Sequence, residues 1–100
     1  ILDAGGKGRV FYVTGYSDIT IQDLQVMGGN AAGLGGDPWG DDAGGGIFVN
    51  VSPAHLRNLV IAANRAYRGG GLFLSAAASI IEDCEIISNT ADSGGGVYLL

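Results

Sequence analysis

The chain has 100 residues, a formal net charge of −5, a single cysteine, and 19 glycines beside only two prolines. This length allows one domain. A hydrophobic content of 47% is too high for a disordered glycine-rich linker. The scarcity of proline excludes collagen. Because the five basic residues form no dense run and no apolar run could span a bilayer, we expect no nucleic-acid partner and no membrane span.

Residues 1–30 are predicted to be a degenerate first coil of a repeat. Gly5-Gly6-Lys7-Gly8 precedes the apolar segment 10–13, and two segments of alternating polarity follow at 19–21 and 24–26. Alternation with a period of two is typical of half-buried β-strands. The polar pair Gln22-Asp23 between them is predicted to be a turn.

Residues 33–42 are predicted to be an inserted loop, because the copy of the repeat that starts at Asn30 carries nine extra residues before its glycines. Insertions into repeats often map to a binding face. Three carboxylates could bind Ca²⁺, and a tryptophan could stack on a sugar ring or contact a protein; the alternative is a solvated polar loop. The candidate binding residues are Asp37, Trp39, Asp41 and Asp42.

Residues 43–100 are predicted to be regular coils. Three glycine triplets begin at Gly44, Gly69 and Gly94, so the interval between successive triplets is constant, and such a fixed period is typical of stacked repeats. An aromatic residue follows each triplet, and an asparagine precedes each. The predicted structural ladders are Asn30, Asn64, Asn89, Gly44, Gly45, Gly46, Gly69, Gly70, Gly71, Gly94, Gly95, Gly96, Phe48, Phe73 and Tyr98.

These patterns predict an all-β fold, a parallel β-helix in which residues 1–100 form a single domain. This solenoid would have three to four coils of about 25 residues, each with about three short strands separated by polar turns at Asp23, Asn58 and Asp83. The chain opens and closes within predicted strands, so it is either a complete subunit or a segment of a longer solenoid.

Segments such as 61–64 followed by 69–72, and 86–89 followed by 94–97, resemble the repeat of polymorphic outer-membrane proteins. The motifs of that family are Phe-x-x-Asn and Gly-Gly-Ala-(Ile/Leu/Val). Here isoleucine or Met27 replaces the phenylalanine, and glycine replaces the alanine. The resemblance implies a right-handed β-helix that is secreted or exposed at the bacterial cell surface, as in adhesins and autotransporter passengers. It does not imply an active site.

A second group of candidate residues is acidic. Glu82, Asp83 and Glu85 could form the paired carboxylates of a polysaccharide lyase or hydrolase, but Asp83 is already explained by its place in a turn. The lone His55 is predicted to be a surface turn residue. Cys84 occupies a core position of the repeat and is predicted to be a small buried hydrophobe.

One exposed turn also carries two cations beside an aromatic ring. Arg65 and Arg68 flank Tyr67. This arrangement is predicted to be either a solvated turn or a small contact for an anion or a sugar.

The function expected from the sequence is structural or adhesive, outside the cell or at its surface, and without enzymatic activity or a bound cofactor. Unpaired strand edges are templates for pairing with another chain, so we expect end-to-end self-association into a filament. Glycans and host or cell-surface proteins are further candidate partners. The alternatives are a fragment of a carbohydrate-active enzyme and a glycan- or protein-binding module that acts through the Trp39 loop.

Overall fold

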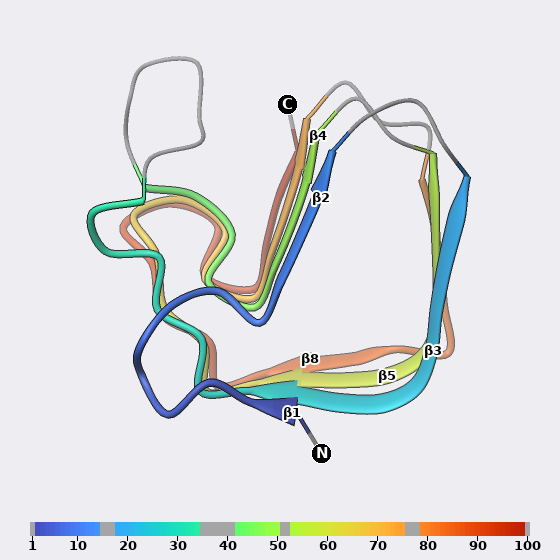
Figure 1. The fold of residues 1–100 in the computed structure, drawn as a ribbon, viewed down its shortest axis with the longest axis horizontal. Helices are drawn as coiled ribbons and strands as arrows, with labels where there is room; N and C mark the ends of the chain where they lie inside the picture. The colour runs from blue at the N-terminus through green and yellow to red at the C-terminus, as the bar shows by residue number, and fades with distance from the viewer. Residues whose placement is uncertain (1, 15–17, 35–41, 51–52, 76–78, 100) are drawn as a thin grey trace.

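The computed structural model describes residues 2–14, 18–34, 42–50, 53–75 and 79–99. Within these ranges the chain forms nine β-strands and no helix, and so no helix that could cross a membrane. The strands form two sheets (Figure 1), and every pairing between strands is parallel.

The first sheet contains four short strands that each follow a glycine-rich segment. Its order is β2 (Phe11–Thr14), β4 (Ile47–Asn50), β6 (Leu72–Ser75) and β9 (Val97–Leu99). These strands are rich in β-branched, aliphatic and aromatic residues, which fit a pleated surface. Neighbours in the sheet are one repeat apart, so the glycine period sets the register: Phe48 pairs with Phe73, which pairs with Tyr98.

The second sheet has longer strands and a bend. Its order is β1 (Leu2–Asp3), β3 (Ile19–Met27), β5 (Ala54–Ala62) and β7 (Ile80–Glu82), and β8 (Glu85–Ile87) also pairs with β5. The bend occurs where Asp23, Asn58 and Asp83 have φ angles of 60°, 50° and 52°. Asp and Asn tolerate this left-handed conformation better than other non-glycine residues.

The bend divides the second sheet into two walls, visible in Figure 1 as its upright and horizontal parts. The lateral wall contains residues 19–22, 54–57 and 80–82, and the basal wall contains residues 2–3, 24–27, 59–62 and 85–87. The lateral wall therefore has three strand segments. The basal wall and the first sheet each have four.

The prediction of a β-helix solenoid with about three short strands per coil is wrong. The described strands form two parallel sheets in a compact all-strand domain that measures 27 × 27 × 19 Å. Asp23 and Asn58, predicted as turns, are single-residue bends inside the nine-residue strands β3 and β5, and Asp83 is the corresponding bend between β7 and β8. Both halves of each bent strand belong to one sheet, which removes the expected third sheet. Because 100 residues supply so few layers, the stacking direction is the shortest dimension of the molecule (Figure 1), and no elongated rod forms.

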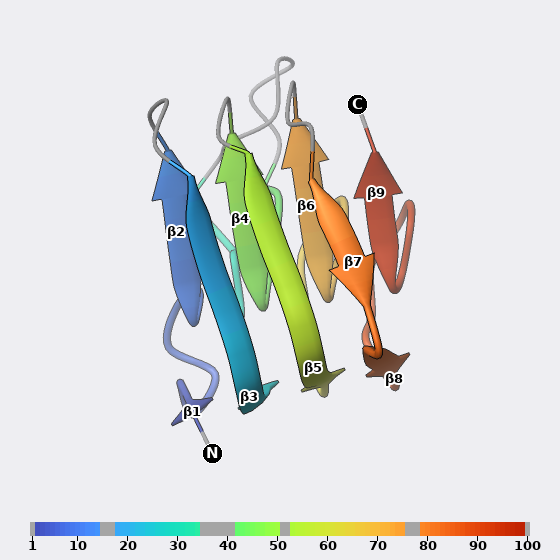
Figure 2. The same cartoon turned by 90° about the vertical axis from the view of Figure 1, so that its right-hand side faces the viewer.

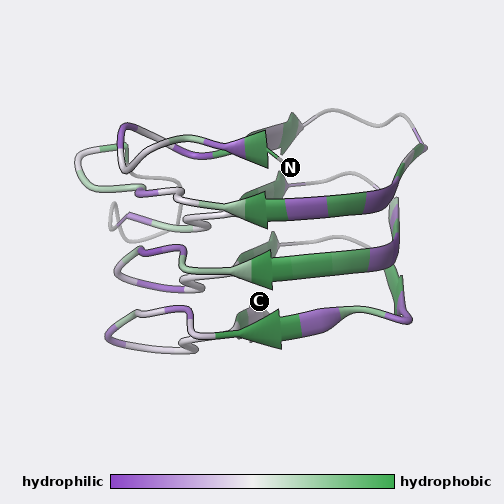
Figure 3. Cartoon of the chain, turned by 90° about the horizontal axis from the view of Figure 1, so that it is seen from below, coloured by the Kyte–Doolittle hydropathy of each residue, from purple (hydrophilic) through white to green (hydrophobic). Residues whose placement is uncertain are grey.

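Two hydrophobic clusters hold the layers together. The larger one fills the space between the sheets and includes Leu56, Leu59, Ile61 and Leu72, all buried. Figure 3 shows the long hydrophobic stretch of β5 in the middle of the basal wall. Phe11 packs against this core. Because successive side chains of a strand point to opposite faces, Phe48, Phe73 and Tyr98 of the first sheet point away from it. They form the second cluster, in which Phe48 and Phe73 pack against Ala43.

Candidate functional site

The predicted binding loop lies largely outside the described residues. Asp37, Trp39 and Asp41 belong to the undescribed segment, whereas Asp42 is described. The Asp42 Oδ2 accepts a hydrogen bond of 2.9 Å from the amide of Gly33, and its carbonyl oxygen accepts from the amides of Tyr67 and Arg68. Asp42 thus joins the start and the end of the inserted segment to the next layer. The described residues contain no group of three or more potential metal-ligating side chains.

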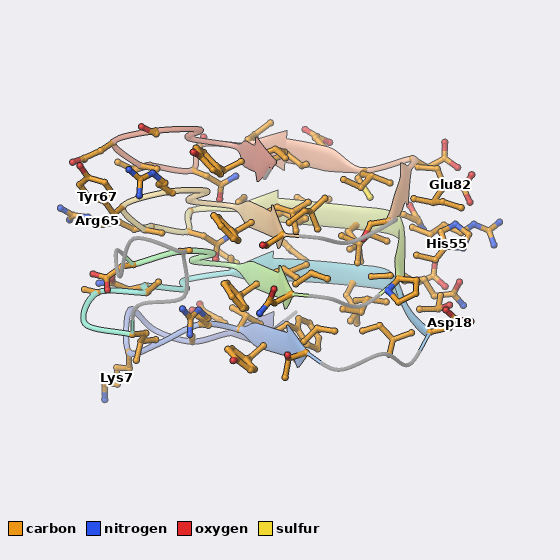
Figure 4. The ribbon with its side chains drawn as sticks, turned by 90° about the horizontal axis from the view of Figure 1, so that it is seen from above. Lys7, Asp18, His55, Arg65, Tyr67 and Glu82 are labelled. Carbon is orange, nitrogen blue, oxygen red and sulfur yellow. The ribbon has the colours of Figure 1, made fainter. Side chains whose placement is uncertain are left out.

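A shallow polar hollow of about 260 Å³ lies beside Asp42. It brings Arg65 and Tyr67, which were predicted as a turn, next to carboxylates from the neighbouring layers. Figure 4 shows Arg65 and Tyr67 on one side of the molecule, opposite the side that carries His55 and Glu82. The hollow has the polar groups to contact a small hydrophilic ligand, and its lining is Asn30, Ala32, Asp42, Arg65, Ala66, Tyr67 and Asp92.

The aromatic residues at the repeat spacing form a stack of four rings. Tyr12, Phe48, Phe73 and Tyr98 have ring-centroid separations of 5.1, 5.4 and 5.4 Å, with interplanar angles of 11° or less. The two phenylalanines are buried, whereas Tyr12, at the N-terminal end of the stack, is 60% exposed. The sequence pattern identified three of these rings; Tyr12 belongs to the degenerate first copy and was not included in the predicted ladder.

Arginine side chains lie against this aromatic stack. The Arg9 guanidinium carbon is 4.8 Å from the Phe48 ring centroid and 5.4 Å from that of Tyr12, and Arg9 Nε donates a hydrogen bond of 2.9 Å to the Ala43 carbonyl. Burial lowers the pKa of Arg9 below its ordinary value, while Tyr12 and Asp42 act in the opposite direction. Arg68 lies similarly near Tyr67 and Tyr98. These cation–π contacts help fix the loops against the first sheet.

The asparagines of the predicted ladder lie in two different environments. Asn64 is buried, and its Oδ1 accepts a hydrogen bond from the amide of Gly29 in the layer before. Asn89 occupies the equivalent place one layer later, where its Oδ1 accepts from the amide of Asn64. Asn30 instead pairs with Arg65, and its Oδ1 accepts from the nearby Ala32 amide. The extra residue before Asn30 places Gly29, not Asn30, in line with Asn64.

The lateral wall carries a charged cluster that sequence reasoning missed. His55 Nε2 lies 2.5 Å from Glu82 Oε1, and Arg57 Nε lies 3.8 Å from the same oxygen. In the sheet, Arg57 is paired with Glu82. Aligning the two copies of the repeat on their glycine triplets would have placed Arg57 beside Glu82. The contact with His55 runs diagonally across the two strands, and the period alone does not indicate it.

The other acidic and nucleophilic candidates do not converge on one point. Asp83 lies at the bend, and Glu85 is exposed on the basal wall. The Cys84 Sγ lies 3.4 Å from the carbonyl oxygen of Leu56 and 3.2 Å from that of Glu82, and the residue is half-buried. These contacts give Cys84 a packing role beside the last layer of the core.

The last layer exposes apolar side chains whose partners in the layer before are buried. We call β7, β8 and β9 the C-terminal edge. Ile81 is 37% exposed there, although its partner Leu56 in the layer before is fully buried. Ile86 and Val97 pack only partly against the core, whereas their partners Ile61 and Leu72 are fully buried. This surface is the interior of the domain left open at one end.

Comparisons of the chain with protein-family models, with curated proteins and with solved structures gave no match.

Proposed function

We propose that this domain is a structural unit that stacks head to tail with further copies of itself. The observation that carries the proposal is the C-terminal edge, where the inward side chain of Ile81 is 37% exposed while Leu56, one layer earlier, is 0% exposed. Covering such apolar area contributes about 25 cal/mol per Å². A further parallel layer would bury these side chains as β7, β8 and β9 now bury those of β5 and β6.

The two ends of the molecule are geometrically compatible. A second copy displaced along the stacking direction, without rotation, would bring its β1 beside β8 and its β2 beside β9 in the parallel sense used throughout the domain. Leu2 would then continue the inward ladder of Ile86, and the exposed ring of Tyr12 would continue the aromatic stack beyond Tyr98. Because this contact joins two different surfaces, it leaves a free end at each addition and leads to a filament.

Open strand edges supply the backbone part of this contact. An edge strand presents amide and carbonyl groups that can pair with another strand. In the domain, such pairing between layers extends outside the strands, since the amides of Gly69, Gly70 and Gly71 donate to carbonyls one layer later. Gly94 to Gly96 occupy the same places in the last layer, so the glycine-rich segment would extend the contact beyond the strands.

The test is the mass of the purified full chain as a function of concentration, measured by sedimentation velocity, with electron microscopy of the largest species. We expect concentration-dependent growth with a repeat of about 4.8 Å along the axis, the spacing of paired strands. Ile86→Lys places a charge on the inward ladder of β8 and should abolish growth. The matched control Ile87→Lys changes the next residue, which is already 45% exposed and lies on the opposite face of the strand, and should leave growth unchanged.

A chain that remains monomeric at its solubility limit would contradict the proposal. Growth that survives Ile86→Lys would contradict the assignment of the interface to the C-terminal edge. Thermal unfolding of both lysine variants shows whether each is folded, because loss of the domain would also abolish growth.

A further inference from the structure

The turns that lead into the glycine triplets lie on successive levels along one side of the molecule. The layers follow one another in a single direction (Figure 2), and parallel backbone bridges join Asn30 to Arg65 and Arg65 to Thr90. The polar hollow of about 260 Å³ lies on this side and is lined by residues of three successive layers. The head-to-tail contact proposed above involves the C-terminal edge and Gly94 to Gly96, none of which lines the hollow.

Hydrogen bonds between the layers fix the backbone around the hollow. The amide of Tyr67 donates to the Asp42 carbonyl at 3.1 Å, and the amide of Asp92 donates to the Tyr67 carbonyl at 3.0 Å. The Asp42 carboxylate is itself held by the amide of Gly33. Because the lining is already ordered in this way, a ligand loses little free energy in organising the site.

Two side chains of opposite charge line the hollow without forming an ion pair. Within the part of the chain that the structure describes, the exposed Arg65 guanidinium and the exposed Asp92 carboxylate have no hydrogen-bonding partner. Asn30 uses its Oδ1 to accept from the Ala32 amide, which leaves its Nδ2 as a donor. A ligand that replaces water here must therefore offer both donors and acceptors.

The charges of the lining select among small hydrophilic ligands. Asp42 and Asp92 outnumber the single cation Arg65, so a phosphate or sulfate group would be repelled. A simple cation would in turn be repelled by Arg65. A neutral molecule with several hydroxyl groups satisfies both kinds of side chain, because a hydroxyl donates to a carboxylate and accepts from a guanidinium.

Tyr67 adds an aromatic surface to these polar groups. The residue is 41% exposed, and the Arg68 guanidinium carbon lies 5.0 Å from its ring centroid, which restricts the ring. An exposed aromatic side chain can contact the apolar C–H groups of a sugar ring while its hydroxyls reach the charged groups nearby. Pockets for drug-sized ligands measure about 300–1,000 Å³, so a hollow of about 260 Å³ suits one sugar ring.

We propose that this hollow binds one neutral pyranose unit of a glycan. The Asp92 carboxylate accepts hydrogen bonds from hydroxyl groups of the sugar, Arg65 and Asn30 donate to its oxygen atoms, and Tyr67 contacts its C–H groups. This inference goes beyond the stacking function and does not depend on it, because the two surfaces share no residue.

The test uses the full chain, isotope-labelled and below the concentration of any self-association, titrated into the millimolar range with the methyl glycosides of glucose, galactose and mannose. We expect at least one glycoside to shift the amide resonances of residues 65–67 and 92 in a saturable manner. Asp92→Ala and Arg65→Gln should each weaken its binding about tenfold or more, the effect of losing a hydrogen bond to a charged group. Tyr67→Leu, which keeps apolar bulk but removes the ring, should also weaken binding.

Glu85→Ala and Arg57→Gln are the matched controls, because they remove the same charges from the basal and lateral walls, outside the hollow. Both should leave the affinity for the glycoside unchanged. Exchange rates of the buried amides of β5 show that each variant remains folded.

The proposal is overturned if none of the three glycosides perturbs the lining residues, or if the controls weaken binding as much as Asp92→Ala and Arg65→Gln do. Two further probes test the class of ligand. Sodium sulfate and glycine, added at the same concentration as the glycoside, should leave residues 65–67 and 92 unperturbed. Saturable binding of either probe at these residues, tighter than that of every glycoside, would assign the hollow to an anion or a zwitterion and overturn the proposal.

Discussion

Asn64 donates a hydrogen bond of 3.0 Å from its Nδ2 to the Oδ1 of Asn89, the residue one repeat later in the chain. Its Nδ2 also donates to the Val26 carbonyl at 3.2 Å, and Asn89 Nδ2 donates to the Ile61 carbonyl at 2.8 Å. Each asparagine thus bonds to the backbone of the layer before it. The layers are held by a polar ladder as well as by apolar packing.

We expect Asn64→Ala to lower the free energy of unfolding by about 2–4 kcal/mol, because it leaves the buried Gly29 amide and Val26 carbonyl without their partner. Urea unfolding followed by circular dichroism measures this change. The matched control is Asn30→Ala, which removes only an exposed local hydrogen bond to Ala32 and should change stability by less than about 1 kcal/mol. Equal effects of the two substitutions would contradict the ladder.

The glycine triplets offer a second comparison between layers. A Cβ on Gly70 would overlap the carbonyl oxygen of Thr90 in the next layer, whereas a Cβ on Gly95 would lie 3.4 Å from its nearest neighbour, the Asn89 carbonyl oxygen. Gly70→Ala should therefore destabilise the domain by about 2 kcal/mol or more. Gly95→Ala should be near neutral in the isolated domain.

The same pair tests whether the C-terminal edge accepts a full repeat-like layer. Gly95→Ala would place a methyl group where such a layer brings its carbonyl oxygen, as Thr90 does beside Gly70. A loss of stability in Gly95→Ala equal to that in Gly70→Ala, measured by thermal unfolding, would contradict the layer geometry. If such a layer docks there, Gly95→Ala should also impair assembly. Ser93→Ala removes one oxygen atom from the same segment and is the control that should leave assembly unchanged.

The sequence predicted the strands and their spacing better than it predicted the sheets. The constant period of the repeat predicts that Phe48, Phe73 and Tyr98 lie in one stack. In a parallel sheet whose neighbouring strands are one repeat apart, residues separated by one repeat lie side by side. The period could not separate a turn from a bend at Asp23, since an aspartate in a left-handed conformation serves in both. That ambiguity produced the incorrect third strand of each coil and, with it, the incorrect solenoid.

Two features of the candidate sites could not be predicted from the repeat period alone. One extra residue before Asn30 moves its side chain out of the ladder, and only the backbone path shows that Gly29 takes the vacant place. The pair of His55 with Glu82 depends on a diagonal contact across neighbouring strands, which requires the register and the side-chain directions together.

The last prediction concerns the inward-facing aliphatic residues of the lateral wall. Two neighbours in this row are similar in size and polarity but differ in burial. Leu56 is fully buried between Ile21 and Ile81, whereas Ile81 closes the ladder and is 37% exposed. Truncating a buried leucine to alanine costs about 2–5 kcal/mol, and the loss grows with the cavity that remains. We therefore expect Leu56→Ala to lower the unfolding free energy by at least about 2 kcal/mol, and Ile81→Ala by less than half as much.

Urea unfolding at low protein concentration measures both values on the single domain. Equal losses for Leu56→Ala and Ile81→Ala would contradict the difference in burial between the two positions, because both substitutions shorten side chains of the same inward ladder.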